Sequence, residues 1–315
     1  MASEYATLTA ALLALLAAYL APKPGLPWPE WAQSRMAILT RFRVEVLREL
    51  SRTSAVTAVL VERAMSSITT RAAAAAAVDT RFQGPLPDVS PDAVRAVTEA
   101  LEAAHARIPA VLEDTYYRAV NAARTAIGDP TPEIQRRLDE LAQRGITGYT
   151  DRSGRRWSLE TYVETTTRAH YAEAAISAYL EVAQRAGVRF VQVSWSYTEC
   201  PRCTPWKGTT LSIDGSPRGT YWVGGRPVVV AGSLTEAREA GLLHPWCRHR
   251  ITVVTGRRIR MGGRGPNDRV ARAEARYRHR TARAWERRRL VALTKQAKTS
   301  AASRVARWRN NQRNR

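Results

Sequence analysis

The sequence predicts a predominantly helical α+β protein, and three observations support this fold class. In the first half of the chain, apolar residues recur at helical spacing between proline-containing breaks. After Gly187 the pattern alternates, with Val191, Val193 and Trp195 between polar neighbours, which is typical of a half-buried strand. The last part of the chain is rich in arginine and poor in apolar residues. We therefore expect long N-terminal helices, a small β-rich unit that contains the cysteines, and a basic C-terminal helical tail.

The first expected helix is the uncharged run "YATLTAALLALLAAYLA" at residues 5–21. Leu8, Leu12, Leu15 and Tyr19 lie at helical spacing within it. Its length is at the lower limit for a membrane span, and Glu4 precedes it instead of a basic cluster. We therefore predict an apolar core or docking helix and no stable membrane span.

Further helices are expected up to Gly145. A long one follows the break "KPGLPWPEW" and continues through six alanines after Arg71. Ser90 and Pro91 are a cap and first-turn proline for a helix that should end near Gly128. Thr131 and Pro132 repeat this start signal for a shorter helix that stops at Gly145.

The segment after Gly145 predicts a small mixed unit. "DRSG" is expected to turn between two short extended pieces, and Ser158 to cap a helix that runs to about Ala186. Gly224 and Gly225 predict a hairpin, in which Pro227 should push the second strand to a sheet edge. A capping box at Ser233 starts a short helix, and the chain then returns to extended structure.

Positive charge is concentrated in the tail. Residues 257–315 contain eighteen Arg and two Lys but only three acidic residues, so they carry +17 of the chain's +21. Such an asymmetry indicates a polyanionic partner such as nucleic acid, an acidic protein surface or an anionic membrane. Seven arginines are the candidate contacts, and the first five form one ridge on a helix: Arg272, Arg276, Arg280, Arg283, Arg287, Arg288 and Arg289. Because this helix lacks a clear apolar stripe, we expect a partner to order it, and the helix to stay mobile without one.

The three cysteines and two of the five histidines form two motifs, "CPRC" and "HPWCRHR". Cys200 and Cys203 make one pair, and His244 with Cys247 makes another, a spacing that suits a structural zinc site. The fourth ligand stays open between His244 and His249, since His249 shares a face with Cys247 in an extended strand. Zinc would tie together a unit whose own core is thin.

Other readings of the cysteines remain open. Buried cysteine often acts only as a small apolar side chain. A hydrolase or nuclease that depends on zinc or cysteine, centred on Cys247 and His249, is the enzymatic alternative, although no orienting acid is evident. A redox role is disfavoured because the thioredoxin-like βαβ pattern is missing, and the odd cysteine count favours a reducing compartment.

Four stretches in order carry a family resemblance: "GITGYTDRSGRRWSLETYVETTTR", "CPRCTPWKG", "HPWCRHRI" and "RTARAWERRRLVAL". Together they resemble the minor capsid protein 2 family of tailed bacteriophages, which is related to the MuF-like head morphogenesis proteins. The resemblance implies a non-enzymatic virion component inside the capsid near the portal, which is present in the host cytoplasm during assembly. The implied partners are the portal protein, the major capsid shell and packaged double-stranded DNA, which the tail would contact without sequence preference.

The resemblance also suggests a division of labour along the chain. Residues 1–144 would be a helical region that docks on the portal or shell. Residues 145–256 would be a MuF-like α+β unit with the Cys/His site, and residues 257–315 the basic tail.

Overall fold

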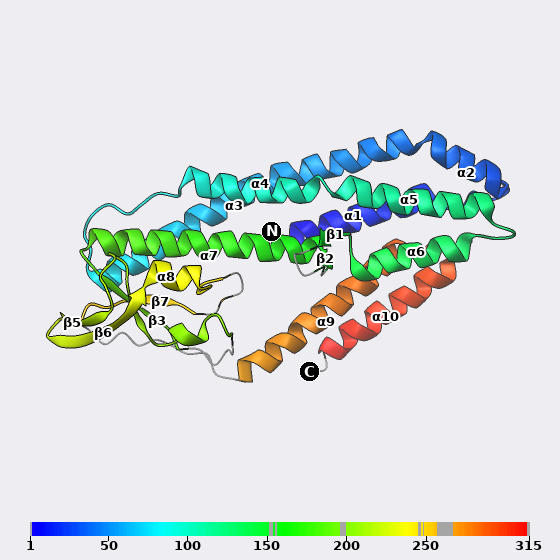
Figure 1. Cartoon of the computed structure of the whole chain (residues 1–315). Coiled ribbons are helices and arrows are strands. Elements are labelled where there is room, and N and C mark those ends of the chain that lie inside the picture. Colours follow the sequence, from blue (N-terminus) through cyan, green and yellow to red (C-terminus); the bar gives the residue numbers. More distant parts are fainter. Residues whose placement is uncertain are drawn as a thin grey trace. The chain divides into compact units, whose positions relative to one another are not determined.

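The computed structural model (Figure 1) describes residues 2–150, 154, 156–195, 200–244, 247, 249–256 and 267–313. For residues 2, 147–150, 267–274, 276 and 309–313 it describes the backbone only. Two compact units are formed, each from several segments of the chain. Unit 1 comprises Met1–Val59, Glu99–Glu164 and Arg272–Arg315, and unit 2 comprises Leu60–Thr98 and Thr165–Ala271. The predicted functional division into three consecutive regions stays a prediction.

The expected fold class, predominantly helical α+β, is confirmed. The helices are α1 (Ala2–Leu20), α2 (Trp28–Ala37), α3 (Leu39–Thr80), α4 (Pro91–His105), α5 (Ile108–Thr125), α6 (Thr131–Arg144), α7 (Leu159–Arg185), α8 (Leu234–Glu239), α9 (Asn267–Leu290) and α10 (Lys295–Arg313). The strands are β1 (Thr147–Thr150), β2 (Arg156–Ser158), β3 (Phe190–Val193), β4 (Thr210–Ser212), β5 (Gly219–Val223), β6 (Arg226–Ser233) and β7 (Ile251–Val253).

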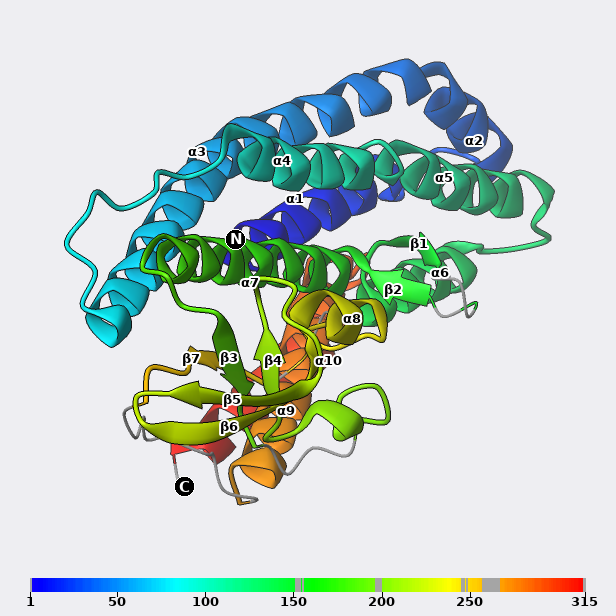
Figure 2. The ribbon, with the colours of Figure 1, turned by 60° about the vertical axis from the view of Figure 1, so that its left-hand side comes forward.

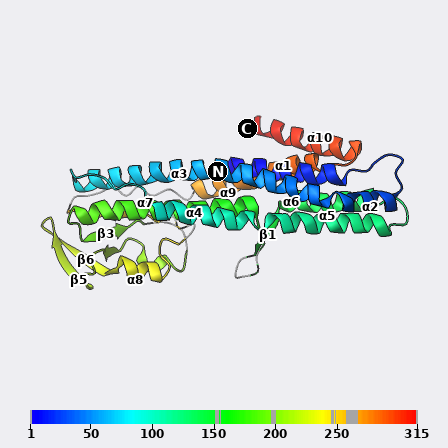
Figure 3. The same cartoon turned by 90° about the horizontal axis from the view of Figure 1, so that it is seen from above.

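Helix α1 lies in the core of unit 1. Its buried face includes Tyr5, Leu12 and Leu16, each of which is fully inaccessible to solvent. His105 on α4 joins two other helices, because its Nε2 is hydrogen-bonded to the Tyr5 hydroxyl (2.9 Å) and its Nδ1 to the hydroxyl of Ser54 on α3 (2.7 Å). Viewed from above, α1 lies alongside the N-terminal part of α3 (Figure 3). The apolar run is therefore a core helix of this unit.

By length and composition alone, Ser3–Leu20 within α1 would also be able to cross a membrane. The core helix of a soluble protein can have the same length and apolar composition, and 44% of this stretch is buried within the protein. The burial of Tyr5, Leu12 and Leu16 supports the core-helix interpretation of the sequence.

One expected helix is divided in two. The sequence predicted a single helix from Pro91 to about Gly128, but α4 ends at His105 and α5 begins at Ile108. The cause is Pro109, which lies in the first turn of α5, where its missing N–H leaves no hydrogen bond unmade. The start signals themselves are correct, since the Ser90 hydroxyl accepts a hydrogen bond from the Ala93 N–H (3.4 Å).

The β1–β2 ribbon and the start of α7 also follow the sequence. The two strands pair antiparallel, and Ser158 then caps α7 by accepting a hydrogen bond from the Thr161 N–H (3.3 Å). Most of the expected "DRSG" turn lies outside the described residues.

Unit 2 contains a mixed five-stranded sheet in the order β5-β6-β4-β3-β7 (Figure 2). The hairpin on Gly224 and Gly225 forms as expected. The expectation that Pro227 places its strand at an edge is wrong, because β6 pairs with both β5 and β4. Proline is tolerated there because the pairing with β4 begins only at Val230, so the N–H missing at Pro227 is not needed for that ladder.

The core of unit 2 packs the sheet against α7 and α8. Buried residues of β3, β4 and β7 meet Cys203 and Leu234 in one cluster. A second cluster joins α3 to α7, where Ala73 and Ala76 of the alanine run contact Val182. Small side chains at these positions allow the two helices to approach closely. The hydroxyl of Tyr179 donates a hydrogen bond to Asp79 of α3 (2.7 Å) and accepts one from the Val253 N–H of β7 (3.2 Å).

Candidate functional site

The sheet of unit 2 brings the two Cys/His motifs together. β3 pairs antiparallel with β7 through Val193 and Ile251. The pairing continues one step further, since the Ser194 N–H donates to the Arg250 carbonyl (2.7 Å) and the Ser194 hydroxyl accepts from the Arg250 N–H (2.8 Å). "CPRC" follows the end of β3, and "HPWCRHR" precedes the start of β7. Antiparallel pairing therefore places two motifs that are forty residues apart at one end of the sheet.

Tight turns aim the side chains of each motif. The Cys203 and Thr204 N–H groups both donate to the Cys200 carbonyl (3.0 and 2.9 Å). In the second motif, the Cys247 N–H donates to the His244 carbonyl (2.8 Å). Each hydrogen bond closes a four-residue turn, so the two members of each pair lie close together in the backbone.

All five predicted ligand residues take part in the site. Two overlapping groups have ligand atoms within 4.8 Å of one another: Cys200, Cys203 and His244 form one, and Cys203, Cys247 and His249 form the other. The Cys203 and Cys247 sulfurs are 3.7 Å apart, and Cys200 Sγ lies 3.2 Å from His244 Nε2. Cys247 Sγ lies 3.4 Å from His249 Nδ1.

Taken pair by pair, these separations are close to those between two ligands of a tetrahedral zinc, while the two groups of three ligands share only Cys203. Zn–S bonds of about 2.3 Å and Zn–N bonds of about 2.0–2.1 Å place two sulfurs about 3.8 Å apart, and a sulfur and a nitrogen about 3.6 Å apart. The Cys203–Cys247 separation is close to the first value, and the two Cys–His separations are slightly shorter than the second. The donor set of thiols and imidazoles also has the softness that zinc prefers.

The two ring nitrogens of His249 differ in their surroundings, and Nδ1 is the one that faces the Cys247 sulfur. The residue is buried, and its Nε2 has no hydrogen-bond partner among the described residues. Burial, with Lys207 and His244 nearby, holds the pKa of His249 below its ordinary value. A neutral imidazole is the form that binds a metal, and in His249 the nitrogen that faces Cys247 is Nδ1.

The three thiols are not equivalent. Hydrogen bonding from the Cys203 N–H is the main cause that lowers the pKa of Cys200 to about 7. Burial, with Cys247 nearby, raises the pKa of Cys203 to about 12. Cys203 is fully buried in the apolar cluster, as expected for a cysteine that acts as a small apolar residue. Cys200 and Cys247 are only partly buried, so that reading alone does not account for them.

A cavity of about 330 Å³ adjoins this site. His244, Cys247 and His249 line it together with Arg168, His170 and Glu173 of α7. Glu173 is ion-paired with Arg238, and burial lowers the pKa of His170. This contribution of α7 was not predicted from the sequence. The available signal was the spacing of His170 and Glu173, which puts both on one face of a helix.

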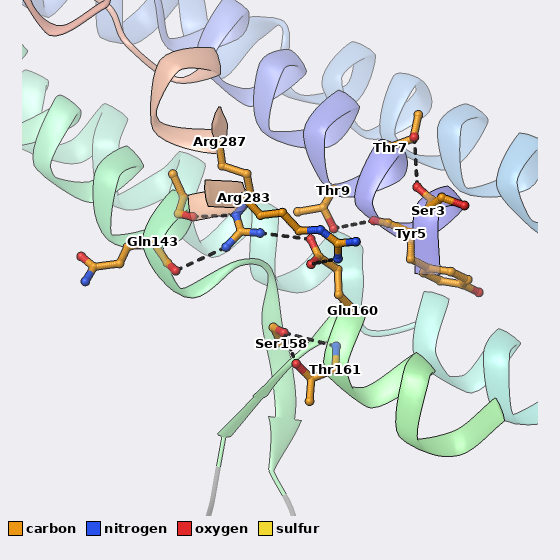
Figure 4. Close-up of polar contacts among 11 residues, drawn as sticks. Ser3, Tyr5, Thr7, Thr9, Gln143, Ser158, Glu160, Thr161, Arg283 and Arg287 are labelled. Carbon is orange, nitrogen blue, oxygen red and sulfur yellow. Dashed lines mark hydrogen bonds and ion pairs between the residues drawn. The ribbon is translucent and has the colours of Figure 1, made fainter. Parts of the chain in front are cut away.

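Tail residues form a second polar centre, within unit 1. Glu160, at the start of α7, accepts hydrogen bonds from Arg283 and Arg287 of α9, both at 3.1 Å (Figure 4). Arg287 also donates to the backbone carbonyls of Ala142 (2.7 Å) and Gln143 (3.4 Å). The Arg287 side chain is only 12% exposed and the Glu160 side chain 14%. We call this set of contacts the Glu160 clamp.

The described tail makes contacts with its own chain that the sequence did not predict, and the expectation that a partner orders it stays a prediction. Besides the clamp, the guanidinium groups of Arg288 and of Arg304 in α10 both contact the Trp285 ring, at 4.6 and 4.4 Å from the ring centre. Val291 is fully buried, and Gln135 of α6 holds the turn between α9 and α10 by hydrogen bonds to the Val291 carbonyl and the Leu293 N–H. Hydrophobic periodicity did not predict these contacts, because each depends on a single residue and not on a repeated pattern.

The seven predicted contact arginines thus differ in their surroundings. Arg283 and Arg287 belong to the clamp, and Arg288 donates to the Gln143 side chain (2.7 Å). Arg280 and Arg289 are exposed. The side chains of Arg272 and Arg276 lie outside the described residues.

Comparison with known proteins gives one match. Neither the curated proteins nor the solved structures yield a match to this chain. The family model for phage minor capsid protein 2 matches residues 1–314, almost the whole chain, and so spans both units, the Cys/His site and the basic tail. A match of this extent shows the family, and the resemblance carried by the four sequence stretches is confirmed. The chain belongs to the phage minor capsid protein 2 family.

Proposed function

We propose that this protein is a structural component of the phage head that sits inside the capsid at the portal and takes part in head assembly. The observation that carries the proposal is the family match over residues 1–314, which implies a virion component. Contact with the portal and the major capsid shell is our inference from the family's role. Synthesis and assembly would take place in the host cytoplasm.

In this proposal, zinc is a structural cofactor of unit 2. Cys200, Cys203 and Cys247 would hold it with His244 or His249 as the fourth ligand. A site closed by four of these five residues would exclude water, which is characteristic of structural zinc, and the two described groups of three ligands share Cys203. A bound zinc would supply folding energy by joining the end of β3 to the start of β7.

The tail would contact packaged DNA through its exposed positive charge. Arg280 and Arg289 are the described members of the predicted set whose side chains are exposed. Arg283 and Arg287 are held by Glu160, so we assign them to anchoring the tail. Release of counterions would drive binding without sequence readout, and its affinity would fall steeply with salt.

Purified virions test the proposal. Mass spectrometry of assembled heads should find the protein, and chemical cross-linking should join it to the portal protein. Elemental analysis of protein purified without chelator should find about one zinc per chain. Absence from mature heads and from assembly intermediates would overturn the virion role, and a zinc-free protein would overturn the cofactor.

A hydrolase or nuclease centred on Cys247 and His249 is the second candidate, and the adjoining cavity is the observation that favours it. His170 and Glu173 line the same space as His244, Cys247 and His249. A titratable histidine and a carboxylate beside a metal are groups that hydrolytic chemistry uses. The test is turnover of plasmid DNA and of casein by the zinc-loaded protein. Activity that Glu173→Gln abolishes while the zinc content is unchanged would support an enzyme, and lack of turnover would leave the structural role.

A further inference from the structure

Unit 1 contains a cavity of about 390 Å³ whose lining is rich in arginine. Three elements contribute to it: one face of α5, one face of α6 and the first residue of β2. The lining residues are Ala110, Val111, Asp114, Thr115, Arg118, Arg137, Glu140, Leu141, Arg144 and Arg156. The α6 members follow spacings of three, one and three residues, so they share one face of the helix. We call this space the arginine cavity.

The ion pairs around the arginine cavity leave two guanidinium groups uncompensated. Asp114 pairs with Arg118 (2.9 Å). Glu140 pairs with Arg136, which does not line the cavity, and Arg137 pairs with Glu133, which also lies outside the lining. Both acidic side chains of the lining are thus neutralised.

Arg144 and Arg156 are the remaining charges. Neither has an ion-pair partner within the part of the chain that the structure describes. They come from different elements, the last turn of α6 and the start of β2, yet they line the same space. Their charge is therefore available to an anion in the arginine cavity.

An unsatisfied donor adds a second observation. Arg137 Nε is buried and has no hydrogen-bond partner among the described residues, although another nitrogen of the same side chain pairs with Glu133. A buried donor without a partner is costly, and such groups usually bind a water or a ligand. An anion bound in the arginine cavity would supply the acceptor.

We propose that the arginine cavity binds a phosphate group, held by Arg144, Arg156 and the Nε of Arg137. Guanidinium groups match phosphate oxygens in geometry and charge. Three donors from separate side chains suit a phosphate better than a carboxylate, because a carboxylate offers only two oxygens. The volume also leaves space for a sugar or a neighbouring group of the ligand.

This proposal does not depend on the role proposed for the tail, because none of the three arginines belongs to residues 257–315. The phosphate has two sources that share one chemistry, the backbone of packaged DNA and a free phosphate or nucleotide. If DNA is the source, the helical unit would add a contact to those proposed for the tail.

The experiment compares two double variants of the full chain that remove equal charge. Arg144→Gln with Arg156→Gln empties the arginine cavity of its free charges. Arg48→Gln with Arg124→Gln removes two exposed arginines elsewhere in unit 1 and serves as the control. Calorimetric titration with inorganic phosphate at low ionic strength measures the affinity, with acetate as the carboxylate probe. Far-UV circular dichroism checks that both variants fold.

We expect the cavity variant to bind phosphate at least about tenfold more weakly, since each lost charge-assisted hydrogen bond is worth that much, and the control to stay unchanged. If a short DNA duplex competes with phosphate for the parent protein, and this competition is lost when Arg144 and Arg156 are replaced, the DNA backbone is the source of the phosphate. Phosphate binding without such competition identifies a free phosphate or nucleotide. Equal affinities of the two variants, equally tight binding of acetate, or an adventitious ion only, bound at precipitant concentrations, would each overturn the proposal.

Discussion

The Glu160 clamp allows a quantitative test of what holds the tail. Glu160→Gln keeps the size of the side chain but removes the negative charge that faces Arg283 and Arg287. Removing one partner of a buried ion pair costs about 3–5 kcal/mol, because the other charge stays buried without compensation. In this variant Arg287 still donates hydrogen bonds to the Ala142 and Gln143 carbonyls, and Arg283 is more exposed than Arg287. We therefore expect Glu160→Gln to reduce the stability of the docked tail by about 2–3 kcal/mol.

Hydrogen exchange is the suitable assay, because it reports local opening of α9 separately from the rest of a chain with two units. A loss of 2–3 kcal/mol corresponds to exchange about 30- to 150-fold faster in α9 peptides. Arg280→Gln is the matched control, since Arg280 is an exposed arginine two turns before Arg287, and its replacement should cost under about 0.5 kcal/mol. Equal exchange in the two variants would refute the clamp as the anchor of the tail.

A double-mutant cycle separates the pair from its surroundings. Arg287→Gln alone removes both the charge and the contacts to the backbone carbonyls. If Glu160 and Arg287 act as a pair, the double variant should cost less than the sum of the two single variants. Strict additivity would assign the stabilisation to other contacts.

Three further predictions concern protonation, the backbone and the metal. Burial holds the pKa of His105 below its value in the unfolded chain, so the folded state binds fewer protons. The free energy of unfolding is therefore unaffected by this residue above about pH 6.5 and decreases as the pH drops below that value. His105 can change the free energy of unfolding by at most about 1.4 kcal/mol per pH unit. Thermal unfolding of His105→Gln, measured between pH 7.5 and 5, should lack this part of the pH dependence. Gly224→Ala should destabilise the hairpin by at least about 1–2 kcal/mol, because Gly224 has a φ of +57° and an added Cβ would lie 2.7 Å from the Gly256 Cα; unchanged denaturant midpoints would contradict this. Chelation should lower the free energy of unfolding of unit 2 by about 4 kcal/mol if free zinc had been present at about a thousand times its Kd. The stability of Cys203→Ser should not respond to chelator, and an equal response of both proteins would argue against the site.

Local chemistry explains why much of the fold was predictable from the sequence. Helix starts at Ser90 and Ser158, the stop at Gly145 and the hairpin at Gly224 depend on residues close in the chain, and the structure contains all of them. The two Cys/His motifs were recognisable for the same reason, since each pair lies within one turn of backbone.

Other features depended on contacts between distant residues. Pairing of β3 with β7 decided that His244 and His249 both approach the cysteines, so neither is excluded as the fourth ligand. Glu160 meets Arg287 across more than a hundred residues, and a hydrophobic period carries no information about a single ion pair. The sequence by itself determined the fold class, the ligand types and the charge of the tail, because these follow from composition and local spacing. Only the tertiary structure decided which arginines anchor the tail and which stay exposed, because burial and pairing depend on the elements that the fold brings together.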